Sequence, residues 1–547
     1  MQNKKSLNLF LWAGVISLAL WAWYLGKDDG QALKEEHSLE KPPKGTPDAL
    51  PSTDPGQETV WLEEPLEEFD FLEGAGMDFE GGDVLLGFGD AGALAEFLKS
   101  ARDKNITVLD SDNVLGLARV SISGLRDLAK LASSLPDDLE IQPNFPVFAP
   151  SPAFPVENGT PRRFGKEALD WLGVPEDNSN WGKRQTLAIL DTGVWKDHEA
   201  FTNAKITQID LLSPEQSVPG DYDGHGTAVA SLIVADSPSL KGIAPSVELL
   251  SVRVLDGEGQ GDTFTVAKGI VEAVDRGANV ISLSLGSHSD NYALRKAVKY
   301  ALDNGAILVA SAGNDSASRI SYPAAYPQVV GVTSVDAGSR LAEFSNIGHG
   351  VELAAPGVGL ASAWIEGKEV SFSGTSASAP LVSGAIAGLL SIDPKLTPNE
   401  ALELLTQHAN DGYAMGKDPR LGHGVIDLAR VLNRGQRGIY DIAVGGYYFS
   451  PITSPSSNKS FDITIQNRGT EWLSGSTLAL TVGTKIKRFQ LGSMKPSQSL
   501  KTEWFLTPEQ ILDPDGTLIK ASIQANGRQD ARPGNNTWST RMVFPND

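Results

Sequence analysis

The 547-residue chain contains no cysteine, and this absence excludes disulfide bridges and metal sites built on thiolates. Basic residues are also scarce, because 46 Lys and Arg stand against 68 Asp and Glu and give a net charge of −22. Such an acidic balance argues against nucleic acid as a partner, since binding to phosphates needs clustered basic side chains. Histidine occurs only seven times, so each candidate for a catalytic base can be considered individually.

Positive charge is missing altogether from one segment. Residues 45–83 hold twelve Asp and Glu and no Lys or Arg, which supplies more than half of the net charge. The overlapping stretch 27–82 is also rich in proline, which interrupts helices. A segment of this composition cannot bury enough apolar surface to fold, so we expect 27–82 to be an acidic, disordered tether.

A long hydrophobic run precedes the tether. Leu7–Leu25 carries no charged side chain, and nineteen residues at about 1.5 Å each nearly cover a bilayer core of roughly 30 Å. Lys4 and Lys5 favour a cytoplasmic N-terminus, and aromatic residues end the run where a cleaved signal peptide would have small ones. We expect residues 1–26 to anchor the chain in the inner membrane, with the rest in the cell envelope outside the cytoplasm. The alternatives are a cleaved signal peptide, which would make the protein secreted, and a buried helix of a soluble protein.

The remaining chain shows three patterns. Residues 83–149 have the order β-α-β-β-α-β, which predicts a small ferredoxin-like α+β domain. Over 160–435, near-continuous apolar runs alternate with helical patterns, which is typical of a three-layer α/β domain with a mainly parallel sheet. Residues 437–547 alternate apolar and polar side chains between turns, which predicts an all-β sandwich. The strands expected in the parallel sheet are 186–190, 247–255, 280–285, 307–312 and 329–335.

A serine-rich stretch in the α/β region could carry chemistry. Residues 371–390 read SFSGTSASAPLVSGAIAGLL, and they could form either a flexible linker or a strand-to-helix turn that presents one serine as a nucleophile. A serine hydroxyl needs a general base within hydrogen-bonding reach and a third group that orients this base. Among the histidines, His225 is the strongest candidate, because glycines flank it and the AVASLI that follows predicts a buried helix.

Two further polar residues end predicted strands. Asp191 closes AILD, at the edge of an open parallel sheet where active sites form, and it could orient the base. Asn314 closes SAGN, and its amide could donate to an oxyanion. Each residue taken alone is more simply explained by a turn, and the serine stretch by a linker. The catalytic interpretation depends on all four features occurring in one predicted domain, each at the end of an element.

These motifs, in this order, resemble those of the subtilases, the subtilisin-like serine proteases. The four residues are Asp191 in DTG, His225 in HGT, Asn314 in AGN and Ser376 in GTSxxxP. Supporting stretches are GIAP, VRVLDGEGQG, SLG, FSNIG, AAPG and GHGVIDLA, and the match runs from about Asp191 to Leu432. The small domain upstream is similar to the family's inhibitory propeptide, and the tail resembles bacterial adhesion-type β-sandwiches.

The resemblance implies a serine endopeptidase that hydrolyses peptide bonds by acyl transfer. Ser376 would attack the scissile carbonyl, His225 would take its proton, and Asp191 would hold the imidazole. Asn314 and the backbone N–H of Ser376 would stabilise the oxyanion, and one such donor is typically worth roughly 10²–10³ in kcat. An extended polypeptide substrate would pair with two backbone edges as a β-strand does. These edges are Gly259, Gln260 and Gly261 on one side and Ser284, Leu285 and Gly286 on the other.

Two departures from the family pattern bear on this expectation. Ala377 follows the nucleophile where subtilisins often have methionine, which should not disable the triad. The segment ADSPSLK before GIAP lacks the Asn-rich loop that binds calcium in many relatives. We therefore assign no metal ligands and no cofactor, although structural calcium is possible.

Two questions of function stay open at this stage. A surface-anchored binding protein with a lost catalytic site is the rival class, but such a protein should lack at least one of the four residues. The tail could bind substrate or envelope, or it could only stabilise the enzyme.

The proline-rich joint after the small domain leads to a zymogen hypothesis. We expect the enzyme to cut itself between about Val147 and Arg163, which would free the catalytic part from its tether. Its partners would then be polypeptide substrates, its own propeptide and the membrane, with no role for nucleic acid.

Overall fold

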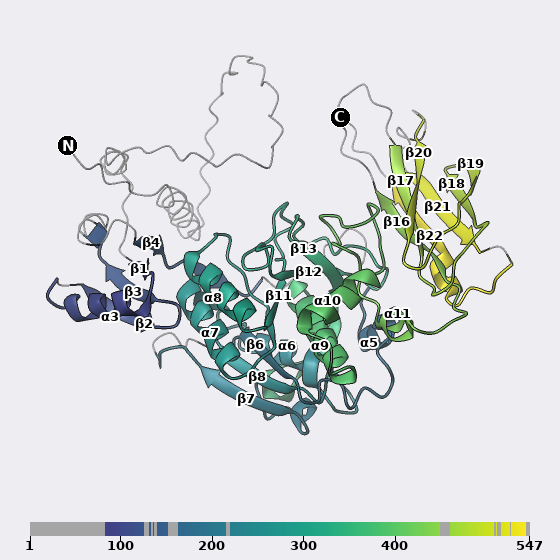
Figure 1. Cartoon of the computed structure of the whole chain (residues 1–547). Helices are drawn as coiled ribbons and strands as arrows, with labels where there is room; N and C mark the ends of the chain where they lie inside the picture. The colour runs from purple at the N-terminus through teal and green to yellow at the C-terminus, as the bar shows by residue number, and fades with distance from the viewer. Residues whose placement is uncertain are drawn as a thin grey trace, which may run out of the picture. The chain divides into compact units, whose positions relative to one another are not determined.

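The computed structural model describes residues 82–542, apart from 105, 125–130, 133–134, 136–138, 151–161, 215–218, 449–459, 508–509, 511–515 and 526. The predicted membrane anchor and tether lie outside the described residues and stay predictions. The chain divides into two compact units, with the boundary between Asn144 and Phe145 (Figure 1).

The first unit contains a small antiparallel sheet with one described helix beside it. The strand order is β2-β3-β1-β4. Asp90 is the N-cap of the helix, and its carboxylate accepts a hydrogen bond of 2.8 Å from the N–H of Ala93. The second helix that the sequence predicts lies mostly outside the described residues. The bounds are β1 (Gly82–Gly87), α3 (Ala91–Ser100), β2 (Thr107–Asp112), β3 (Leu117–Ile122) and β4 (Glu140–Pro143).

A seven-stranded parallel sheet forms the centre of the second unit, as the sequence predicts for this region. Its order is β13-β12-β11-β10-β6-β8-β7, and each neighbouring pair is parallel. The five predicted strands correspond to β6, β8, β10, β11 and β12, whereas the two edge strands were not predicted. The bounds are β6 (Thr186–Asp191), β7 (Lys205–Asp210), β8 (Glu248–Arg253), β10 (Val280–Leu283), β11 (Ile307–Ser311), β12 (Val330–Val335) and β13 (Val351–Pro356).

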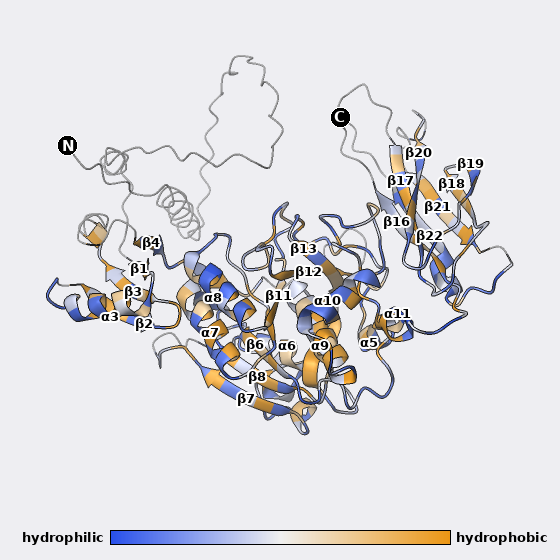
Figure 2. Cartoon of the chain, in the orientation of Figure 1, coloured by the Kyte–Doolittle hydropathy of each residue, from blue (hydrophilic) through white to orange (hydrophobic). Residues whose placement is uncertain are grey.

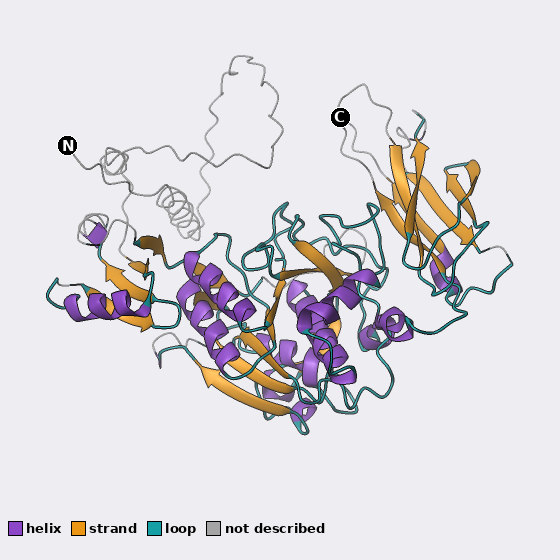
Figure 3. Cartoon of the chain, in the orientation of Figure 1, coloured by secondary structure: helices purple, strands orange, loops and turns teal. Residues whose placement is uncertain are grey.

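Helices cover both faces of this sheet (Figure 3). Side chains alternate along a strand, so Leu187 and Ile189 of β6 pack with α6 and α9 on one face. Leu190 points to the opposite face, where it lies beside Gly269 of α7. The helix bounds are α5 (Ala168–Leu172), α6 (His225–Val234), α7 (Thr263–Asp275), α8 (Tyr292–Asp303), α9 (Thr375–Ile392), α10 (Pro398–Gln407) and α11 (Leu428–Asn433).

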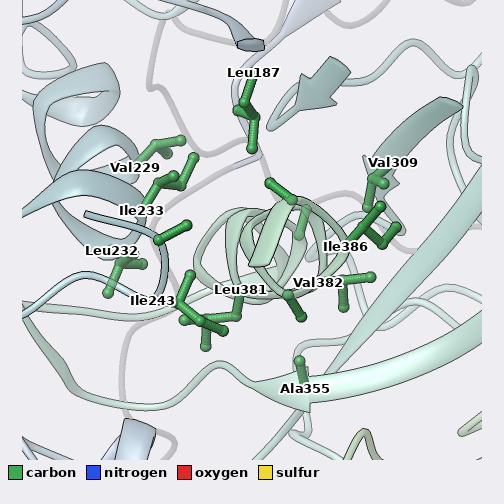
Figure 4. Packing of buried hydrophobic residues seen from close by; sticks show 14 of the residues in the cluster. Leu187, Val229, Leu232, Ile233, Ile243, Val309, Ala355, Leu381, Val382 and Ile386 are labelled. Atoms are coloured by element: carbon green, nitrogen blue, oxygen red, sulfur yellow. The ribbon is translucent and has the colours of Figure 1, made fainter. Parts of the chain in front are cut away.

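Helix α9 lies in the middle of the largest hydrophobic cluster. It is long and apolar enough to cross a membrane, but 89% of it is buried inside the fold, which identifies it as a core helix. Figure 2 shows its hydrophobic colouring, and Figure 4 shows Leu381, Val382 and Ile386 of α9 among side chains from the sheet and from α6. Gly384 lets the helix approach Ile243 closely, because a Cβ at Gly384 would lie 2.1 Å from the Ile243 side chain.

The C-terminal strands form two antiparallel sheets, β16-β17-β20 and β19-β18-β21-β22. Both sheets contribute to one apolar cluster, for example through Ile463 of β17 and Leu480 of β18. The bounds are β16 (Ile442–Tyr448), β17 (Ser460–Asn467), β18 (Thr477–Val482), β19 (Lys485–Gln490), β20 (Ser499–Phe505), β21 (Thr517–Gln524) and β22 (Thr537–Met542).

Buried charges join α11 to the strands that follow it. Asp427 and Asp441 are 3% and 1% exposed. Arg532 donates to both, at 2.6 Å to Asp427 and 2.7 Å to Asp441. Arg430 donates to the backbone carbonyl oxygens of His408 and Ala409 at 2.7 and 2.6 Å. The Arg532 contacts connect the α/β region and the C-terminal sheets within the second unit, and the Arg430 contacts hold α11 to the chain after α10.

Candidate active site

The predicted base and its orienting acid meet at the carboxyl end of β6. Asp191 is the last residue of β6, and His225 is the first residue of α6. The His225 Nδ1 lies 2.8 Å from Asp191 Oδ1, and the two side chains are 4% and 1% exposed. A carboxylate can only accept, so Nδ1 carries the proton and Nε2 of the neutral imidazole is left as the basic nitrogen.

Gly226, the glycine of the HGT motif, makes this approach possible. A Cβ at Gly226 would lie 2.3 Å from the carbonyl oxygen of Gly193 and 3.0 Å from Asp191 Oδ1. No side chain fits there, so the first turn of α6 can lie directly against the end of β6. Asp191 is fixed further by the N–H of Thr192, which donates to Oδ1 at 2.7 Å.

The serine-rich stretch is a strand-to-helix turn, not a linker. Strand β15 (Glu369–Phe372) ends two residues before Gly374, and α9 begins at Thr375. Gly374 has φ +135°, a conformation that side-chain-bearing residues rarely adopt, which explains the glycine of the GTS motif. Ser376 is the second residue of α9 and is 1% exposed. Within the described part of the chain, neither Ser376 Oγ nor His225 Nε2 has a hydrogen-bond partner.

A proline in α9 changes how the candidate nucleophile is held. Pro380 has no N–H, so it cannot donate to the carbonyl of Ser376, four residues earlier in the helix. The Oγ of Ser284 donates to this carbonyl instead, at 3.1 Å. Ser284 directly follows β10, so the nucleophile turn is bonded to the substrate edge that the sequence predicts.

The predicted oxyanion donor is held by the same turn. The Asn314 Oδ1 accepts hydrogen bonds of 2.9 Å from both the N–H and the hydroxyl of Thr375. The Thr375 hydroxyl in turn accepts from the N–H of Gly313 at 3.1 Å. These bonds fix the amide so that its nitrogen faces Gly374, where an added Cβ would meet it at 2.8 Å.

An extended segment of the chain itself, Phe145–Ala149, lies on the two predicted substrate edges. Strand β5 (Pro146–Phe148) pairs antiparallel with β9 (Gln260–Asp262). Phe148 exchanges two backbone hydrogen bonds of 2.9 Å with Gly286, and the N–H of Ala149 donates to the carbonyl of Gly259 at 2.8 Å. The segment thus bridges both edges as an added strand.

Sequence reasoning missed this segment and the two aromatic rings beside His225. Phe372 packs edge-on against the imidazole, with ring centroids 5.3 Å apart, and Tyr222 lies 6.1 Å away. A single aromatic residue in a loop, such as Tyr222, or at the end of a short strand, such as Phe372, carries no periodic signal that could have indicated it. Among the residues that the structure describes, no group of three or more His, Asp or Glu side chains could hold a metal ion.

Comparison with known proteins identifies the family of the chain. The subtilase family model matches residues 182–424. Thermitase from Thermoactinomyces vulgaris is 38% identical over 221 residues, which cover 40% of this chain and 78% of thermitase. Subtilisin Savinase from Lederbergia lenta is 33% identical over 248 residues, which cover 45% of this chain and 90% of that protein.

Comparison with solved structures finds the same family fold. The crystal structure of fervidolysin from Fervidobacterium pennivorans matches with a TM-score of 0.55 at 19% identity, over 82% of this chain and 90% of that chain. The α/β part of the second unit therefore has the subtilisin-like fold, and the protein is a serine-type endopeptidase. The chain belongs to the subtilase family.

Proposed function

We propose that Asp191, His225 and Ser376 are the catalytic triad of this endopeptidase. The observation that carries the proposal is the buried 2.8 Å hydrogen bond between His225 Nδ1 and Asp191. The Ser376 Oγ attacks the carbonyl carbon of the scissile peptide, and its proton passes to His225 Nε2. Asp191 holds the ring in this tautomer and stabilises the imidazolium that forms.

The tetrahedral intermediate then breaks down in two stages. The amide of Asn314 and the backbone N–H of Ser376 stabilise its oxyanion. His225 gives its proton to the leaving amine, which departs and leaves an acyl-enzyme on Ser376. Water attacks the ester with His225 again as the base, and the carboxylic acid product is released. Thr375 supports this role by fixing the Asn314 amide.

We further propose that the protein is made as a zymogen that cuts itself. Support comes from Phe145–Ala149, whose backbone pairs with both proposed substrate edges as a bound polypeptide would. After the joint, the N–H groups of Phe164 and Gly165 donate to backbone carbonyls of the α/β domain, at 3.0 and 2.8 Å. Residues up to Ala149 and from Arg162 onward are therefore held, and the bond that is cut lies between them.

We also assign a role to each of the other parts of the chain. The first unit, together with Phe145–Ala149, acts as the inhibitory propeptide. The C-terminal sheets form a β-sandwich that stabilises the enzyme, which the buried bridge from Arg532 to Asp427 and Asp441 favours over a purely binding role. Residues 1–26 anchor the precursor in the membrane, and the cut frees the catalytic part outside the cytoplasm.

Expression of Ser376→Ala beside the wild type tests the triad and the zymogen together. We expect the variant to stay full length and membrane-bound, and the wild type to give a soluble product whose N-terminus lies between residues 150 and 162. Ser383→Ala is the matched control, because its hydroxyl lies in the same helix and bonds the carbonyl of Ala379. This control should be processed as the wild type is.

Two outcomes would contradict the proposal. Processing of Ser376→Ala at the wild-type site, in cells without the active enzyme, would show that another protease makes the cut. A product that begins shortly after Leu25 in the Ser376→Ala protein would identify a signal peptidase and would exclude the membrane anchor.

A further inference from the structure

The segment on the substrate edges presents alternate side chains to the enzyme. Phe145, Val147 and Ala149 are 7%, 0% and 5% exposed, whereas Pro146 and Phe148 between them are only half-buried. This alternation is the period of a β-strand, with one face against the protein. The three buried side chains decrease in size along the strand, from phenylalanine through valine to alanine.

The smallest of the three lies beside an aromatic ring. A Cβ added to Gly259 would meet the Tyr222 ring at 2.9 Å and the Ala149 Cβ at 3.2 Å. Tyr222 and Ala149 therefore both lie against the same point on the substrate edge. The two share the space beside Gly259, so the ring is the neighbour that a larger side chain at position 149 would meet there.

The backbone of Tyr222 is held on both sides. Its N–H donates to the carbonyl of Gly257 at 2.8 Å, and its carbonyl accepts from the N–H of His225 at 2.8 Å. The same ring lies 6.1 Å from the His225 imidazole. A substrate side chain that pushed the ring aside would therefore press it toward the catalytic base or pull on the loop that positions this base.

We propose that Tyr222 is a specificity-determining residue that restricts the enzyme to polypeptides with a small side chain at the place of Ala149. The preferred substrate is an extended chain with an aliphatic residue at the place of Val147 and alanine, glycine or serine two residues later. The inference rests on the proposed function, because it assumes that Phe145–Ala149 occupies the positions of a bound substrate. Tyr222 acts on the choice of substrate and takes no part in the chemical step.

Two internally quenched peptides test the proposal with the mature enzyme. The first has the sequence of residues 145–163, and the second carries leucine in place of Ala149. We expect the wild type to cut the alanine peptide with a kcat/KM at least about tenfold above that for the leucine peptide, since a few added carbons in a closed pocket cost this much. Mass spectrometry of the products shows whether both peptides are cut at the same bond.

Removal of the ring should relax this preference. In Tyr222→Ala we expect the ratio between the two peptides to fall to within about threefold, and in Tyr222→Leu to an intermediate value. Tyr300→Ala, which removes a half-buried aromatic side chain of α8 whose hydroxyl donates to Asp275, should keep the wild-type ratio. The ratio is the readout, because it cancels any common change in catalytic rate.

The outcomes separate this inference from the function on which it rests. Equal ratios for the wild type and Tyr222→Ala would overturn the role of Tyr222 while leaving the proposed triad intact. Hydrolysis of casein but of neither peptide would show that Phe145–Ala149 does not lie as a substrate does, and it would overturn this inference. If the folded wild type hydrolysed neither casein nor peptides, the proposed triad itself would be wrong.

Discussion

Asp418 should destabilise the protein at neutral pH, so we expect Asp418→Asn to stabilise it. The side chain is 6% exposed, and its Oδ1 accepts from the N–H groups of Arg420 and Leu421 at 2.7 and 2.9 Å. Oδ2 has no hydrogen-bond partner among the described residues. Burial, helped by the nearby charge of Asp411, raises the pKa of Asp418 from its ordinary value of 3.8 to about 6.

The sign of the effect follows from this raised pKa. Ionisation of Asp418 costs more free energy in the folded chain than in the unfolded one. The stability that this carboxyl contributes is therefore present below about pH 4 and is lost as the pH rises to about 6. A shift of about two pKa units corresponds to at most about 3 kcal/mol. Asparagine keeps the Oδ1 acceptor without the charge, so we expect a gain of about 1–3 kcal/mol above pH 6.

Urea unfolding at pH 4.5 and 7.5, in the Ser376→Ala background to prevent self-digestion, measures this gain. Asp427→Asn is the matched control, and we expect it to lower the stability at pH 7.5 where Asp418→Asn raises it. Burial would raise the pKa of Asp427, but Arg532 and its hydrogen bonds hold it below the ordinary value. The control should lose about 1–3 kcal/mol at pH 7.5, because Arg532, which is 40% exposed and keeps Asp441, loses one charged hydrogen-bond partner. The reasoning is refuted if Asp418→Asn is no more stable than its parent at pH 7.5, or if its gain is the same at both pH values.

Two further predictions concern the chemical step. Ser284→Ala removes the hydroxyl that donates to the Ser376 carbonyl, so kcat should fall about five- to tenfold with KM nearly unchanged. Ser284→Thr should restore kcat. An unchanged kcat for the alanine variant would count against the positioning role of Ser284. Asn314→Leu should lower kcat by roughly 10²–10³ with little change in KM, and a loss expressed mainly in KM would argue that the amide binds substrate instead. Steady-state kinetics with active-site titration checks both.

Much of the fold could be predicted because buried parallel strands are continuous apolar runs. Five strands of the central sheet were found in this way, whereas β7 was missed because KITQID mixes charged and apolar residues at an exposed edge. The residues of the proposed triad could be predicted because each lies at the end of an element: Asp191 ends β6, His225 begins α6 and Ser376 is the second residue of α9. Strand β5 could not be predicted, since its three residues begin with a proline and show no period, and their partner β9 lies more than 100 residues later.

The contacts that position Ser376 and that border the proposed substrate edge were the hardest to predict. The hydrogen bond from Ser284 goes to the Ser376 carbonyl, which Pro380 leaves without its usual helical donor in another element. The closeness of Tyr222 to Ala149 depends on two loops that meet at Gly259. Neither contact leaves a pattern in the residues around it, because each is set by the packing of segments far apart in the chain.

Helix α9 also imposes an order on synthesis. All seven strands of the central sheet precede α9 in the chain, and α9 covers much of one face of that sheet. Until residue 392 has been made, this face has α6 but lacks its longest helix, so it cannot complete its core. The same helix carries Ser376, the proposed nucleophile, so under that proposal a nascent chain cannot hydrolyse peptides before α9 is in place. Chains interrupted before α9 would then be both incompletely packed and inactive, since one late segment provides the missing helix and the proposed nucleophile together.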